Sequence, residues 1–234
     1  MSQFILIAGA FHGAWAWRRL APLLEAEGHD VRRLDLTGQG ARAHTATPET
    51  DLSTHIEDIV AYLDMEDIER AILVGHSYSG MVVTGAADQL GDRVSHLVYA
   101  DAMVPTDGQS AADYSGPKLT ATALAKANGH WLVDNFFPLS KFGPFASAED
   151  EAWFVSKLRP HPMKTFFEPL HLKGPPPRRR TFIASTVDPL GVNDAALEMA
   201  KASADWGYHE IATKHDAMLT APRELADILL SLDE

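Results

Sequence analysis

The chain has 234 residues, of which 46% are hydrophobic and 22% charged, as in an ordinary globular protein with one large core. Its 20 basic and 32 acidic side chains leave a net charge of -12, which argues against a nucleic-acid partner because phosphates need a basic surface. The absence of cysteine excludes disulfides, cysteine zinc sites and a thiol nucleophile.

The N-terminal segment is apolar but has no basic stretch in front of it, and Arg18 and Arg19 end it well short of a membrane span. We therefore expect a cytoplasmic protein that does not bind membranes. We expect its partner to be a small-molecule substrate, and we expect no cofactor. The sequence leaves a homodimer open.

Strand and helix patterns alternate through the first hundred residues. Apolar runs predict strands over 4–8, 30–36, 70–75 and 94–99. Apolar residues at helical spacing predict helices over 15–27, 53–64 and 80–90, and Thr54 and Glu57 have the spacing of a capping box for the second helix. This alternation is typical of a parallel sheet with helices on both faces.

The segment 105–178 differs from the rest, because it holds ten of the fourteen prolines and ten of the twenty aromatic residues. We interpret it as an inserted, mostly helical cap that ends at "GPPPRRR", so that the core consists of residues 1–104 and 179–234. After the cap we expect a strand over 181–186, a helix over 192–203, a strand over 207–212 and a final helix that begins near Pro222.

Ser77 lies at the predicted turn between strand 70–75 and helix 80–90, in the segment Gly75-His76-Ser77-Tyr78-Ser79. A serine nucleophile at such a sharp turn needs small residues two positions before and after it, and Gly75 and Ser79 satisfy this requirement. The alternative is a capping serine in a glycine-rich turn, but the position between strand and helix favours the nucleophile.

A serine hydroxyl needs a base and an acid to activate it, and the acid is expected between the serine and the histidine in the sequence. His215 follows the predicted last strand, and Asp188 follows strand 181–186, so both lie at the carboxyl ends of strands. We therefore assign His215 as the base and Asp188 as the acid. Asp101, after strand 94–99, is the rival acid, and its alternative role is to brace the chain entering the cap.

Two backbone amides must stabilise the oxyanion that forms on the substrate. One is expected from Tyr78, directly after the nucleophile, and the other from the loop "AGAFHGAW" after the first strand.

Aromatic residues of the cap are candidates for an apolar pocket above Ser77, although such residues more often pack within the cap itself. The candidate substrate-binding residues are His12, His76, Trp131, Phe137, Trp153 and Phe154; Phe166 and Phe167 are further cap aromatics of this kind. The histidines are scattered along the chain, so we expect no metal site.

Five segments together resemble the α/β-hydrolase branch that contains plant methyl esterases, plant hydroxynitrile lyases and bacterial esterases: "FILIAGAFHGAWAW", "GHSYSGM", "LVYADAMVP", "STVDPLG" and "HDAMLTAPRELADILL". The resemblance implies an α/β-hydrolase fold with an inserted helical cap, and a triad of Ser77, Asp188 and His215. It further implies oxyanion amides on Ala10 and Tyr78, with His12 supporting the first loop.

Departures from the family bear on the reaction. Ala8 and Gly9 replace the usual His-Gly, which removes a brace of the oxyanion loop. Hydroxynitrile lyases of this branch carry threonine and lysine where this chain has Gly9 and Asp216, and Asp216 would repel cyanide, so the lyase reaction is disfavoured. We expect hydrolysis of a small hydrophobic carboxylic ester, or of a related activated acyl compound, through an acyl-enzyme. A noncatalytic receptor on the same fold and a cofactor-free dioxygenase are the alternatives.

Overall fold

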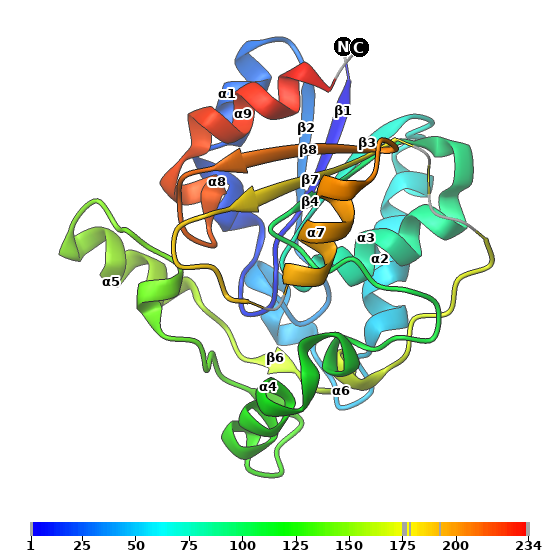
Figure 1. Ribbon diagram of the computed structural model, residues 1–234. Helices are drawn as coiled ribbons and strands as arrows, with labels where there is room; N and C mark the ends of the chain where they lie inside the picture. The colour runs from blue at the N-terminus through cyan, green and yellow to red at the C-terminus, as the bar shows by residue number, and fades with distance from the viewer. Residues whose placement is uncertain (1, 175–176, 178, 192, 233–234) are drawn as a thin grey trace.

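Six parallel strands form one sheet in the computed structural model, which describes residues 2–174, 177, 179–191 and 193–232 (Figure 1). Their order across the sheet is β2 (Asp30–Leu34), β1 (Gln3–Ile7), β3 (Ala71–His76), β4 (Val94–Ala100), β7 (Arg180–Ser185) and β8 (Trp206–Ile211). The predicted, mostly parallel sheet of about six strands is thus confirmed. The central strands are continuous apolar runs because helices cover them on both sides.

Helices cover both faces of the sheet, and each face has its own apolar core. One face is covered by α2 (Leu52–Met65), α3 (Ser79–Leu90) and α7 (Asp194–Ala202). The other is covered by the 3-10 helix η1 (Ala14–Arg18) and by α1 (Ala21–Ala26), α8 (Ala217–Thr220) and α9 (Pro222–Ser231) (Figure 1). Two further 3-10 turns, η2 (Gly40–Thr45) and η3 (Gly91–Arg93), lie in connections.

Local structure differs from the predictions at three points. The helix expected over 15–27 is divided into η1 and α1, because Pro22 is well placed only in the first turn of a new helix. The capping box of α2 joins Asp51 and Thr54 rather than Thr54 and Glu57, since the Asp51 carboxylate accepts from the Thr54 amide at 3.0 Å. Helix α7 is shorter than the predicted 192–203, and residue 192 lies outside the described residues.

The chain between β4 and β7 folds over the carboxyl ends of the strands (Figure 1). Its elements are α4 (Ala111–Ala127), β5 (Leu132–Val133), the 3-10 turn η4 (Leu139–Lys141), α5 (Ala148–Lys157), β6 (His161–Pro162) and α6 (Lys164–Phe167). Helix α4 is kinked at Gly116, where φ is 79° before Pro117. Within the predicted cap end "GPPPRRR", residues 175, 176 and 178 lie outside the described residues. Among the described residues, no helix is both long and apolar enough to span a membrane.

The strand order has a switch point between β1 and β3. The chain runs from β1 to β2 on one side and returns to β3 on the other side of β1. Loops that follow β1 and β3 therefore diverge, and open parallel sheets bind ligands at such a switch point. The loop after β1 contains Ala10, and the turn after β3 contains Ser77.

Candidate active site

Ser77 occupies a strained turn between β3 and α3, as the sequence predicts. Its φ is +55°, a left-handed value that is unusual for a residue with a side chain and is found at functional sites. A Cβ added to Gly75 would lie 2.8 Å from the carbonyl oxygen of Ser79, and a Cβ on Gly80 would collide with the carbonyl of Met103. The small residues around Ser77 therefore permit a turn that presents its hydroxyl at the end of the strand.

His215 is paired with Asp101, so the assignment of Asp188 as its acid is wrong. The Nδ1–H of His215 donates to the Asp101 carboxylate at 2.6 Å, and both side chains are buried. Asp101 directly follows β4, and its backbone is also left-handed, with φ of +45°. Asn193 holds this turn by donating to the carbonyl oxygen of Asp101 at 2.8 Å.

Asp188 is exposed and binds the cap instead. Its carboxylate accepts from Lys141 Nζ, which also donates to the Asp188 carbonyl at 3.3 Å. The nearby Lys141 ammonium, chiefly through this hydrogen bond, lowers the pKa of Asp188. The sequence could not separate the two acids by order, because Asp101 and Asp188 both lie between Ser77 and His215 and both follow a strand.

The two predicted oxyanion amides border the same pocket as Ser77. Ala10 and Tyr78 both line it, and among the described residues neither amide hydrogen has a hydrogen-bond acceptor. The loop that carries Ala10 approaches the nucleophile closely, since a Cβ on Gly9 would lie 2.6 Å from Ser77 Cβ. A threonine at Gly9, as in the lyases, would therefore collide with Ser77 in this chain.

Tyr78 is held from behind by a buried histidine. Its hydroxyl donates to His55 Nδ1 at 3.1 Å, because His55 uses its Nε2–H to donate to the carbonyl oxygen of Thr37 at 2.8 Å. Burial lowers the pKa of His55 to about 4, so this ring is neutral at physiological pH. The backbone of the oxyanion residue is thereby anchored through its own side chain.

His12 and His76 lie behind the pocket rather than in it, which corrects their assignment as substrate-binding residues. Both are buried, and neither lines the pocket. His12 donates to the carbonyl oxygen of Ala10 at 2.7 Å, and His76 donates to the carbonyl oxygen of His215 at 3.1 Å. Asp216 is also fully buried behind the pocket, so it does not contact a bound ligand there.

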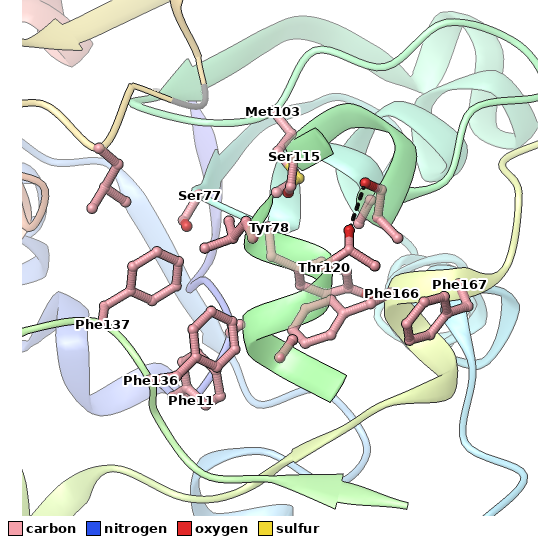
Figure 2. A pocket seen from close by; sticks show the side chains of 16 residues that line it. Phe11, Ser77, Tyr78, Met103, Ser115, Thr120, Phe136, Phe137, Phe166 and Phe167 are labelled. Carbon is pink, nitrogen blue, oxygen red and sulfur yellow. Dashed lines mark hydrogen bonds between the residues drawn. The ribbon is translucent and has the colours of Figure 1, made fainter. Parts of the chain in front are cut away.

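The pocket beside Ser77 is apolar and largely aromatic (Figure 2). Figure 2 shows the rings of Phe11, Phe136 and Phe137 below Ser77, whereas Phe166 and Phe167 lie at the far end beyond Tyr78. The other lining residues are Ala10, Met103, Ala111, Ala112, Ser115, Leu119, Thr120, Ala123 and Leu190. None of these described lining residues carries a charge.

Of the four cap aromatics among the predicted substrate-binding residues, only Phe137 lines the pocket. Phe154 is fully buried in the core against Phe142, and Trp153 packs against Trp15 and the guanidinium of Arg18. Trp131 is 38% exposed on another part of the surface.

Sequence reasoning missed several lining residues, above all Phe11, Phe136, Met103 and Leu190. Phe11 carries a local signal, since it lies within the predicted oxyanion loop, directly after Ala10. Phe136 is adjacent to Phe137 and carries none, because only the path of the folded cap brings it over the strands.

Three buried residues, His76, His215 and Asp216, bring ligand-type atoms within 4.8 Å of one another. Hydrogen bonds already engage His76 with His215 O, His215 with Asp101, and Asp216 with His12. We therefore assign these side chains to a hydrogen-bond network and not to a metal.

Comparison with known proteins agrees with this fold. The model of the alpha/beta hydrolase family matches residues 4–228. The chain belongs to this family. A carbendazim-hydrolysing esterase from a Nocardioides species is 32% identical over 244 residues, which cover 99% of this chain and 100% of the relative. Methylesterase 2 of Arabidopsis thaliana is 39% identical over 107 residues, or 44% of this chain and 40% of the relative.

Solved structures of this alpha/beta hydrolase's relatives share its fold. An extracellular alpha/beta-hydrolase from a Paenibacillus species has a TM-score of 0.84 at 24% identity, with 99% of both chains covered. Tomato methylketone synthase I has a TM-score of 0.77 at 21% identity, with 99% of this chain and 97% of that chain covered. The relatives named as esterases make this alpha/beta hydrolase a carboxylesterase-type hydrolase, as the resemblance predicts.

Proposed function

We propose that the protein is a serine esterase that cleaves a small, uncharged carboxylic ester with an apolar or aromatic part. The observation that carries the proposal is the buried pair of His215 and Asp101, in which His215 is hydrogen-bonded to His76, the residue directly before the strained Ser77 turn. With Nδ1 engaged by Asp101, His215 presents Nε2 as the acceptor for the Ser77 proton.

In the proposed reaction, Ser77 Oγ attacks the ester carbonyl while His215 Nε2 takes its proton. The amides of Ala10 and Tyr78 stabilise the oxyanion, and the alcohol leaves with the proton from His215. Water then attacks the acyl-enzyme with His215 again as base, and the carboxylic acid is released. Asp101 holds the imidazole in the required tautomer and stabilises its cation.

The pocket supports the choice of substrate. Its walls are aromatic and aliphatic and carry no charge among the described lining residues, so a charged group would lose its hydration without a partner. The hydroxyl of Thr120 is engaged by the carbonyl oxygens of Ala112 and Gly116. Carbendazim, named for the Nocardioides relative, is a defined compound to test beside simple esters.

The test measures how fast wild type and Ser77→Ala hydrolyse p-nitrophenyl and methyl esters with acyl groups of increasing size. Ser231→Ala, which changes an exposed serine on α9, is the control. We expect Ser77→Ala to lose at least about 10⁴-fold in kcat and the control to match wild type. A fluorophosphonate should label wild type at Ser77 alone. Undiminished turnover by Ser77→Ala would refute the serine mechanism, and tight ligand binding without turnover by wild type would favour the receptor.

A further inference from the structure

Asp216 connects three loops of the site, although it does not reach the pocket. It follows His215 in the chain and is fully buried. Its Oδ2 lies 3.0 Å from His12 Nε2, on the loop after β1. Its Oδ1 lies 3.5 Å from the Nε2 of His76, the residue that precedes Ser77. The carboxylate of Asp216, the residue after the base, thus faces both a residue of the oxyanion loop and the residue before the nucleophile.

The contact between Asp216 and His12 is an ion pair. His12 Nδ1 must carry a proton, because its partner is the carbonyl oxygen of Ala10, which can only accept. Burial alone lowers the pKa of His12, but the Asp216 carboxylate outweighs this effect and raises it. Burial likewise raises the pKa of Asp216, and the facing His12 reverses this and lowers it. Both nitrogens of His12 therefore donate.

The surroundings of His12 keep water away from this pair. Its ring stacks on Trp15 with centroids 5.3 Å apart and contacts Phe142 and Phe154 at 5.5 Å. The other titratable ring that faces it is His76, at 5.9 Å. Burial lowers the pKa of His76 well below its usual range, so His76 is neutral.

The loop that His12 holds is strained. The amide of His12 donates to the carbonyl oxygen of Gly9 at 3.3 Å, which closes a β-turn with Ala10 and Phe11 at its centre. Phe11 has φ of +70°, a left-handed value that this turn position usually reserves for glycine. Such a backbone persists only when surrounding contacts enforce it. The bond from His12 to the Ala10 carbonyl, directly before Phe11, is such a contact.

We propose that Asp216 is a positioning residue, which holds His12 against the Ala10 carbonyl and so keeps the Ala10 amide aimed at the oxyanion. The inference rests on the proposed esterase function. It also accounts for a loop that folds without the usual His-Gly brace, because this chain has Ala8-Gly9 there. Misplacing a catalytic group by about 1 Å can cost about 10²-fold in rate.

Asp216→Ala and Asp216→Asn test the role of the carboxylate. Alanine removes the support of His12, so we expect kcat to fall about 10- to 100-fold while KM changes less than about 3-fold. Asparagine can donate through Nδ2 to the Nε2 of a neutral His12, so it should recover most of the lost kcat. Asp227→Ala, which removes an exposed carboxylate from α9, is the control that should match wild type.

Inhibitor binding separates positioning from a general loss of structure. A trifluoromethyl ketone forms an oxyanion on Ser77, whereas the corresponding secondary alcohol binds without one. We expect Asp216→Ala to weaken the ketone about as much as it lowers kcat and to leave the alcohol unchanged. Equal loss of both affinities, or an unchanged kcat, would overturn the proposal.

If Asp216→Ala does not fold, nitrogen NMR of the wild-type histidines still decides the question. We expect both ring nitrogens of His12 to be protonated at about pH 7, just above the ordinary histidine pKa of about 6.5, where an ordinary histidine is mostly neutral. An unprotonated Nε2 would overturn the proposal. Failure of the esterase proposal itself would look different, since wild type would then not turn over esters through Ser77.

Discussion

At the scale of single residues, the hydrogen bond between Asp101 and His215 requires a carboxylate at position 101, which accepts the Nδ1 proton of His215. Asp101→Asn would keep the shape but favour the wrong imidazole tautomer, so we expect kcat to fall about 10⁴-fold. Asp188→Asn makes the same chemical change at an exposed ion pair with Lys141, and we expect a change of less than about 3-fold. Kinetics on one p-nitrophenyl ester would compare them, and greater loss in Asp188→Asn would reverse the assignment of the acid.

The sequence predicts the nucleophile and the base but does not separate Asp101 from Asp188. Ser77 and His215 carry local signals, in a small-residue turn and in the position after the last strand. Asp101 and Asp188 share the two sequence signals, since both follow a strand and both lie between Ser77 and His215. Their backbones are also alike, with left-handed φ values of +45° and +52°. What distinguishes them is tertiary: Asp101 is buried against His215, whereas Asp188 faces the cap.

At the scale of elements, the Ser77 turn depends on the close packing of α3 against the strand behind it and the loop after β4. Gly80→Ala would drive a methyl group into the Met103 carbonyl, so we expect a loss of about 1 to 3 kcal/mol in unfolding free energy and lower activity. Gly174→Ala is the matched control, because a Cβ there would meet no atom of the described residues within 4 Å. Urea denaturation measures both, and equal stabilities would show that the turn can relax.

Strands and helices with a strong apolar pattern can be predicted from the sequence. Element boundaries that depend on a single contact cannot. The core strands follow from apolar runs because both faces are buried. The break between η1 and α1 and the choice of Asp51 over Thr54 as the N-cap depend on particular bonds. The placement of cap aromatics depends on how the cap folds, which is why Phe137 reaches the pocket while Trp153 stacks on Arg18 outside it.

At the scale of the whole molecule, buried neutral histidines make stability sensitive to acid. Burial lowers the pKa of His55 and His96 to about 4. In the unfolded chain these rings protonate below about pH 6.5, so unfolding takes up protons and stability falls as the pH drops from about 6.5 to 4. His12 adds nothing in this window, because its raised pKa leaves it protonated in both states.

The expected slope is on the order of 1 kcal/mol per pH unit for each such histidine. Urea denaturation at about pH 7 and 5 should show the loss. His96→Gln should make the slope shallower, and His130→Gln, at an exposed histidine, should not change it. An unchanged slope in His96→Gln would contradict the burial argument for this ring.

The position of β8 at the edge of the sheet also affects how this enzyme loses activity on heating. Within the part of the chain that the structure describes, β8 is an edge strand that pairs with β7 alone, and the loop after it carries His215. Edge strands detach at a lower free energy than the centre of a sheet. We therefore expect mild heating to abolish activity while most of the sheet is still folded, so that loss of activity precedes global unfolding.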